Sequence, residues 1–159
     1  MRPATPADHA AIHAVEAAAF GREVEARIVV DTRAEGAALV ELVAEEEGRI
    51  VGHILFSRMR CDPPRFVAGL GPVAVSPERQ SRGIGDALCR AGVEAVRALG
   101  AEAVVLLGHP TYYPRFGFSH ALAAPLASPF AKNEAFMGLE LKPGALAPPL
   151  KVDFPAAFG

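Results

Sequence analysis

The sequence predicts an α/β protein of the α+β type, with a mixed, mostly antiparallel central sheet of six or seven strands and about four flanking helices. Two observations favour this fold class. Three successive runs rich in Val, Leu and Ile, separated by turn residues, indicate an antiparallel meander. The last run leads into an amphipathic helix and then a short, wholly apolar run, which is the order of a right-handed parallel βαβ unit.

The N-terminal part of the chain is predicted to be helical. Thr5 suits the N-cap of a first helix over residues 6–20, because apolar side chains recur there at helical spacing and Gly21 ends the pattern. A second amphipathic helix is predicted over residues 22–33. Residues 1–3 leave room for only a stub of a strand before the first helix.

The meander follows these helices. Residues 38–44 and 49–59 are predicted to form a hairpin around the acidic turn at 45–48, where the closing glycine suits a positive φ. The prolines within residues 61–65 predict a loop, and residues 66–75 predict the third strand.

The βαβ unit and a further strand come next. The face that the helix turns to the sheet is predicted to carry Ile84, Leu88, Ala91, Ala95 and Leu99. Gly100 suits the C-terminal cap of this helix, and residues 103–107 predict a buried strand. Residues 111–116 predict a short helix, and residues 135–141 another strand that pairs with a segment distant in sequence.

The C-terminal tail, residues 142–159, is rich in Pro and Ala and has no periodicity. We expect an extended segment that lies on the surface or adds a final edge strand. With 159 residues, the chain is expected to form one domain around one core. An exposed strand at 135–141 could pair across a two-fold axis and give a homodimer.

Composition excludes several classes of function. The chain is 51% hydrophobic and 21% charged, and no apolar run approaches the roughly 20 residues needed to cross a bilayer. The net charge is −2 and the basic residues are scattered, so neither nucleic acid nor a membrane is an expected partner. The N-terminus lacks signal-peptide features, which predicts a cytoplasmic protein. Cys61 and Cys89 are expected to be reduced and structural, and no metal site is predicted.

The stretch from Gly71 to Gly85, GPVAVSPERQSRGIG, carries the main functional signal. Gly83 and Gly85 open the predicted helix, and glycines let backbone N–H groups approach an anion at the positive end of the helix dipole. Arg82 would add a mobile charge. The pattern is neither a P-loop nor a dinucleotide fingerprint. Taken alone, it is equally compatible with a tight structural turn.

The order of the elements resembles that of the GNAT superfamily of N-acetyltransferases, from Arg2 to Phe118. The most specific motifs are GPVAVSPE from Gly71, the turn Gln80-x-x-Gly83-x-Gly85, and YPRFGF from Tyr113. The chain looks most like a small bacterial group with the pattern Gly-x-Pro-Tyr-Tyr-x-Arg-Phe-Gly-Phe. Here that pattern reads GHPTYYPRFGF, with one residue inserted before the tyrosine pair.

This resemblance implies acetyl-CoA as the co-substrate and a sheet that splays apart to admit it. The pyrophosphate is expected on the turn formed by Gln80, Ser81, Arg82, Gly83, Ile84 and Gly85. The pantetheine arm is expected along the strand segment Val73, Ala74 and Val75. Tyr113 takes the place of the family tyrosine that protonates the departing CoA thiolate, with Tyr112 and Phe116 beside the cofactor. Both tyrosines could instead be ordinary packing aromatics.

The general base stays open at this level. Candidates are Glu25, Glu46, His53 and His109, or water. The alternative interpretations are a solvated helix face for Glu25, an exposed turn for Glu46 and a satisfied strand residue for His53. The two cysteines lack an activating neighbour in sequence, so neither is expected to act as a nucleophile.

The resulting hypothesis is an acyltransferase that acetylates a primary amine of a small molecule, a peptide or a protein. The alternative is a non-catalytic module of the same fold that binds CoA or acetyl-CoA, and a doubly wound nucleotide-binding domain is a more distant third. The acceptor is expected to bind between the first two helices, Tyr113 and the tail. Its identity does not follow from the sequence.

Overall fold

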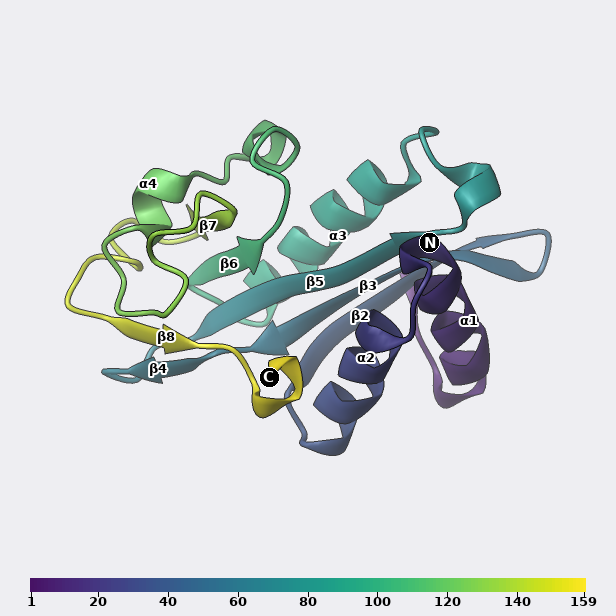
Figure 1. The fold of residues 1–159 in the computed structure, drawn as a ribbon, viewed down its shortest axis with the longest axis horizontal. Helices are drawn as coiled ribbons and strands as arrows, with labels where there is room; N and C mark the ends of the chain where they lie inside the picture. The colour runs from purple at the N-terminus through teal and green to yellow at the C-terminus, as the bar shows by residue number, and fades with distance from the viewer.

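The computed structural model of the protein describes residues 1–159 in full (Figure 1). Its central sheet has six strands in the order β1-β2-β3-β5-β6-β7, and only β5 and β6 run parallel. The predicted fold class is therefore confirmed. The strands are β1 Arg2–Pro3, β2 Ala38–Glu46, β3 Arg49–Arg58, β5 Val67–Val75, β6 Ala103–Leu107 and β7 Phe136–Glu140.

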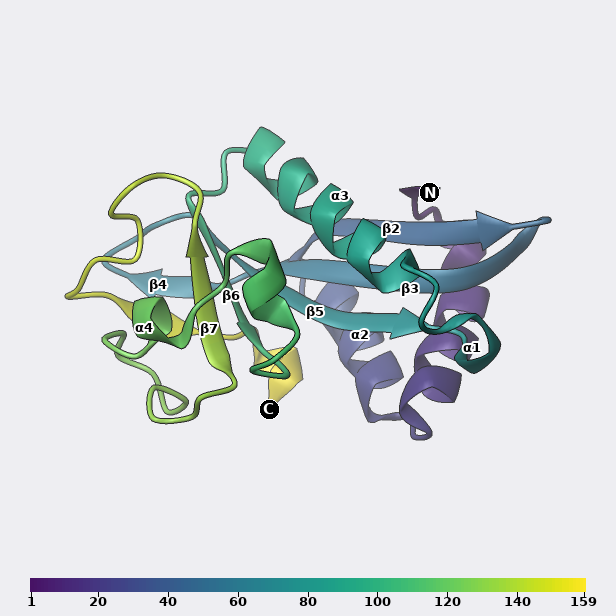
Figure 2. The same cartoon turned by 90° about the horizontal axis from the view of Figure 1, so that it is seen from above.

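Helices cover both faces of the sheet. Helices α1 (His9–Phe20) and α2 (Val24–Ala34) pack on one face, and α3 (Ile84–Ala98) lies on the opposite one (Figure 2). The short helix α4 (His120–Ala123) packs against β7. Single turns of 3-10 helix are η1 Pro6–Asp8, η2 Pro77–Arg79, η3 Tyr113–Phe116 and η4 Ala156–Phe158. No helix combines the length and the apolar character that crossing a membrane requires.

Strand β3 joins the two layers because successive side chains of a strand point to opposite faces. Ile54 and Phe56 are fully buried in the cluster that contains the apolar side chains of α3. Leu55, between them, is fully buried against Ile12 of α1 and Val29 of α2. This strand therefore contributes buried side chains to the packing of the helices on both faces of the sheet.

The buried face of α3 differs from the predicted one. Leu99 is 54% exposed, while the buried residues of the helix are Leu88, Cys89, Gly92, Val93 and Val96. On this face the ring of Phe56 lies against Gly92, where a Cβ atom would be 2.1 Å from it. Gly100 has the predicted positive φ of 99° after the helix end.

The predicted loop at 61–65 contains a short strand, and the tail adds a strand outside the main sheet. Residues Arg60–Asp62 form strand β4, which pairs with β8 (Lys151–Asp153) in a separate two-stranded sheet. The tail therefore adds no strand to the main sheet. Instead it buries Ala145, Leu146, Leu150 and Val152 against β5, β6 and β7 in a second apolar cluster.

Two further predictions concern the sheet edges. Strand β1 forms the expected stub, paired with Val43 and Leu42. Strand β7 pairs with β6 and is the last strand on its side of the sheet. At the edge that faces away from β6, Gly138 forms an isolated bridge to Ser119. A homodimer through this edge stays a prediction.

Candidate active site at the splayed strands

The site begins where β5 and β6 separate. The two strands pair only from Val67 with Ala103 to Gly69 with Val105, although β5 continues to Val75. On its other side β5 pairs with β3, where Ile54 pairs with Val73 and Phe56 with Leu70. Gly71 and Pro72 of β5 therefore lie opposite the single residue Leu55 of β3. An extra residue of this kind is a β-bulge, which bends a strand away from its regular path. The edge of β5 beyond the bulge has no partner strand on the β6 side.

The turn after β5 presents unpaired backbone donors. The six amides from Ser81 to Asp86 make no hydrogen bond within the protein, and the first helical bond of α3 runs from Ala87 to the carbonyl of Gly83. Gly83 has a φ of 82°, a conformation that glycine adopts without strain. Gln80 closes the turn by donating from Nε2 to the carbonyl of Val75 at 3.1 Å. Six free N–H groups at a helix N-terminus form a site for an anion such as a pyrophosphate.

A first cleft of about 420 Å³ lies over this turn. Its lining consists of Val75, Arg79, Gln80, Ser81, Gly83, Ile84, Gly85, Asp86, Tyr112 and Arg115. Tyr112 donates its hydroxyl to Asp86 at 2.5 Å, and burial together with this hydrogen bond raises the pKa of Tyr112. The Arg115 guanidinium stacks 4.3 Å from the Tyr112 ring centroid. Two arginines and the free amides make this cleft suitable for a phosphorylated ligand.

A second cleft of about 480 Å³ lies at the bulge of β5 and the end of β6. It is lined by Phe20, Arg22, Glu25, Ile28, Leu70, Gly71, Pro72, Val73, Leu107, Gly108, His109, Tyr113, Phe154 and Phe158. This is the expected position of the acceptor pocket, between the first two helices, Tyr113 and the tail. The candidate Glu25, which is distant in sequence, therefore shares one cavity with His109 and Tyr113.

Tyr113 is held by its contact with Gly108. A Cβ atom at position 108 would be 2.3 Å from the Tyr113 ring, so only glycine leaves room for the ring in this place. Burial raises the pKa of the Tyr113 hydroxyl, which is therefore protonated at neutral pH. The residue can donate a proton but does not act as a base.

The two tyrosines lie on the boundary between the clefts. Their rings are perpendicular, with centroids 4.9 Å apart, and Tyr112 lines the first cleft while Tyr113 lines the second. On β5, Val75 lines the first cleft and Val73 the second. A ligand that lies along the free edge of β5 would thus extend from the anion-binding turn to the second cavity.

Comparisons with known proteins identify this arrangement. The family model for the acetyltransferase (GNAT) family matches residues 10–118, well over half of the chain. This chain belongs to the GNAT family. It is 43% identical over 117 residues to the uncharacterized N-acetyltransferase YjhQ of Escherichia coli (strain K12), a match over 70% of this chain and 64% of that protein. The chain thus spans slightly less than two thirds of the length of YjhQ.

Two solved GNAT structures are similar over 99% of this chain. One is a GNAT family acetyltransferase from Brucella melitensis in complex with acetyl-CoA, with a TM-score of 0.84, 38% identity and 96% of its own chain covered. The other is YhbS from Escherichia coli in complex with CoA, with a TM-score of 0.89, 29% identity and 89% of its own chain covered. The expectation of a GNAT fold is confirmed by these comparisons.

The candidates for the general base differ in where they lie relative to the two clefts. Glu25 accepts two hydrogen bonds from Arg22 at 2.9 and 2.6 Å, and this pairing lowers the pKa of Glu25. His109 is exposed at the rim of the second cleft. Glu46 pairs with Arg79 at 2.7 Å and lines neither cleft. Of the three, only Glu25 and His109 line the second cleft.

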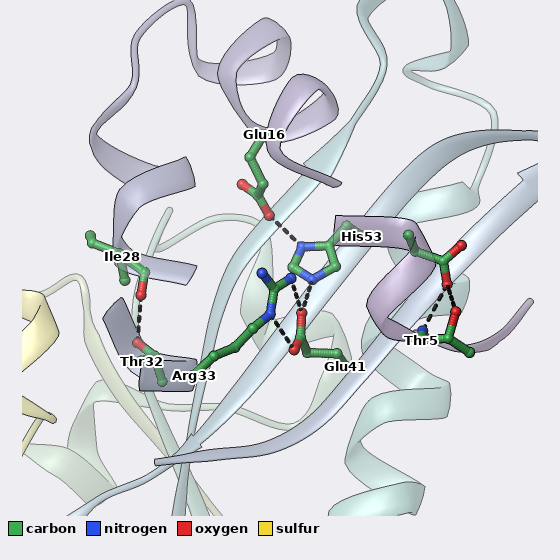
Figure 3. Close-up of polar contacts among 8 residues, drawn as sticks. Thr5, Glu16, Ile28, Thr32, Arg33, Glu41 and His53 are labelled. Atoms are coloured by element: carbon green, nitrogen blue, oxygen red, sulfur yellow. Dashed lines mark hydrogen bonds and ion pairs between the residues drawn. The ribbon is translucent and has the colours of Figure 1, made fainter. Parts of the chain in front are cut away.

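His53 lies in a buried polar network behind the site (Figure 3). Its side chain is fully enclosed, with Nδ1 2.7 Å from Glu16 and Nε2 2.9 Å from Glu41. Arg33 completes the chain of charges with two hydrogen bonds of 2.8 Å to Glu41. Burial lowers the pKa of His53, but the hydrogen bonds to the two carboxylates outweigh it and the pKa is raised. His53 is a satisfied strand residue and cannot reach an acceptor.

This network was missed by sequence reasoning, although a signal for it exists. Glu16 lies four residues after Ile12, on the buried face of the helix that otherwise carries Ile12 and Val15. An acid in that position needs a buried partner. The network joins α1, α2, β2 and β3, and so fixes the two helices that carry Phe20 and Glu25 into the second cleft.

Other predicted site residues lie less centrally. Ala74 is 2% exposed, so it can offer a ligand only its backbone. Arg82 is exposed and lines neither cleft. Phe116 also lines neither cleft and lies beneath the Arg90 guanidinium, 4.9 Å from the ring centroid. Burial raises the pKa of Cys89 to about 12, which keeps the thiol protonated and poorly nucleophilic. No group of three or more His, Cys, Asp or Glu side chains is arranged so that it could hold a metal ion.

Proposed function

We propose that this chain is an acetyl-CoA-dependent N-acyltransferase that moves an acetyl group directly to a primary amine of a small molecule, a peptide or a protein. The observation that carries the proposal is the pair of clefts that meet at the free edge of β5. One is built for a phosphorylated ligand, and the other contains a protonated tyrosine and a carboxylate. The acetyl-CoA and CoA bound by the two similar GNAT structures support the same assignment.

The free amides from Ser81 to Asp86 would hold the pyrophosphate, and Arg79 and Arg115 would add positive charge beside it. The unpaired edge from Val73 to Val75 would bind the pantetheine arm through its backbone. Acetyl-CoA supplies the activated thioester. Backbone N–H groups at this edge are suited to polarise the thioester carbonyl.

The chemistry balances with the residues in the second cleft. An acceptor that binds as an ammonium group first loses one proton to solvent. The neutral amine nitrogen then forms a bond to the acetyl carbon as the carbon–sulfur bond breaks, the nitrogen loses one further proton and the sulfur gains one. Tyr113 gives its hydroxyl proton to the sulfur, since its raised pKa keeps it protonated until then. Glu25, His109 or a water molecule between them receives the proton of the amine. Holding both reactants in adjoining clefts supplies the larger part of the rate.

The proposal is tested by thiol release from acetyl-CoA with a panel of primary amines. Tyr113→Phe keeps the ring against Gly108 but removes the acid, so kcat is expected to fall by about 100-fold or more, with little change in the KM for acetyl-CoA. Tyr112→Phe removes a hydroxyl from the first cleft and is expected to alter the KM for acetyl-CoA rather than kcat. Unchanged turnover in Tyr113→Phe would remove Tyr113 from the mechanism.

A non-catalytic module of the same fold would need the first cleft but not the second. Calorimetry with acetyl-CoA, run beside the amine panel, separates the two functions. Tight binding of acetyl-CoA without thiol release for any amine would favour the binding module.

A further inference from the structure

The second cleft has an unusually aromatic wall. Four of its lining residues are Phe20, Tyr113, Phe154 and Phe158, which come from the end of α1, from η3 and from the C-terminal tail. The remaining apolar lining is Ile28, Leu70, Pro72, Val73 and Leu107. Sites of this size and character bind small molecules with an apolar body. The body of the acceptor therefore meets rings and aliphatic side chains.

The tail builds one side of this wall. Phe154 and Phe158 are half-buried, with ring centroids 5.3 Å apart, and Phe130 packs edge-on against Phe154 at 5.8 Å. The turn that carries Phe158 is tied to the end of α2, where Ala157 donates its N–H to Glu35 at 2.9 Å. Figure 1 shows the C-terminal turn beside α2. The two rings are thus held in place rather than free in solvent.

The polar part of the lining is small. Glu25 is the one carboxylate in the cleft, and its side chain is 13% exposed. Arg22 engages each oxygen of Glu25 once, and a carboxylate has about four acceptor positions, so positions for an ammonium group remain. The pairing lowers the pKa of Glu25, which keeps it charged at neutral pH. One carboxylate matches a single amine, whereas a polyamine would leave its other charges against apolar rings.

We infer that the acceptor is an arylalkylamine, a primary amine joined by a short aliphatic chain to an aromatic ring. Its amine lies at Glu25 and Tyr113, and its ring lies against Phe154 and Phe158. This inference rests on the proposed acetyl transfer and names the substrate class of the same site. Stacked or edge-on aromatic contacts add to the hydrophobic gain of burying the ring.

The test compares kcat/KM for thiol release with phenethylamine, n-butylamine and spermidine. The expected kcat/KM for phenethylamine exceeds that for each of the others by about ten-fold or more, because the ring adds several buried carbons. Phe158→Ala is expected to raise the KM for phenethylamine by about ten-fold and to leave the KM for acetyl-CoA unchanged. Glu25→Gln is expected to raise the KM for phenethylamine and for n-butylamine alike, since both present the same amine.

Leu99→Ala is the control, because this leucine is 54% exposed at the far end of α3. Equal or better use of n-butylamine or spermidine, or an unchanged KM for phenethylamine in Phe158→Ala, would overturn the inference while leaving acetyl transfer in place. Thiol release with none of the amines, despite calorimetric binding of acetyl-CoA, would instead remove the proposed function and the inference with it.

Discussion

Gly108→Ala tests how closely the position of Tyr113 controls turnover. The new Cβ atom would lie 2.3 Å from Cε2, 2.8 Å from Cδ2 and 3.2 Å from Cζ of the Tyr113 ring. Two carbon atoms in contact need about 3.5 Å, so the ring must retreat by roughly 1 Å. The φ of Gly108 is not positive, so alanine adds no backbone strain. A displacement of about 1 Å can cost about 100-fold in rate, and we expect a loss of that size in kcat.

The assay is a double-mutant cycle on kcat for thiol release. If Gly108→Ala acts by moving the Tyr113 hydroxyl, it has no further effect on kcat once Tyr113→Phe has removed that hydroxyl. Thr111→Ala, at an exposed position of the same loop, is the control and is expected to keep kcat. Full kcat in Gly108→Ala, or additive losses in the double variant, would refute the reasoning.

Two further predictions concern stability. Burial opposes the charge of Glu41, but hydrogen bonds from His53 and Arg33 outweigh it and lower the pKa of Glu41 to about 2 in the folded chain, against about 4.3 when unfolded. A pKa that is lower in the folded chain stabilises the fold above about pH 4.3, and this stabilisation is lost as the pH falls toward about 2. Glu41→Gln should therefore make Tm, measured by circular dichroism, fall less steeply with decreasing pH. An unchanged slope of Tm on the acid side would contradict this. Gly92→Ala should lower the free energy of unfolding by up to about 2 kcal/mol in urea, since overpacking costs about 1–3 kcal/mol and alanine returns about 1 kcal/mol of helix propensity. A more stable Gly92→Ala would show that Phe56, 2.1 Å from the new Cβ atom, can move aside.

The sheet and the long helices could be predicted because their signals are local. The hairpin of β2 and β3 follows from alternating apolar runs around a turn, and Glu47 and Gly48 both have the positive φ of a tight hairpin turn. The turn from Gln80 to Gly85 is local as well, since its glycines and the following helix lie within one short stretch. Such features need no knowledge of distant contacts.

The features that escaped prediction depend on distant contacts. Strand β4 is three residues long and forms only because residues near 152 return to pair with it. The tail carries no periodicity because it covers apolar strands rather than joining their sheet. Likewise, the partner of Glu16 lies 37 residues away, and nothing local to His53 indicates that both of its ring nitrogens are engaged.

The tyrosine pair combines both kinds of information. In a regular α-helix, two adjacent tyrosine side chains point in directions about 100° apart. A 3-10 turn has about three residues per turn, so the angle between adjacent side chains is larger. Here Tyr112 precedes η3 and Tyr113 begins it, and the backbone N–H of Tyr112 donates to the carbonyl of His109 at 3.1 Å. The Tyr113 ring packs against Gly108, and one tyrosine lines each cleft.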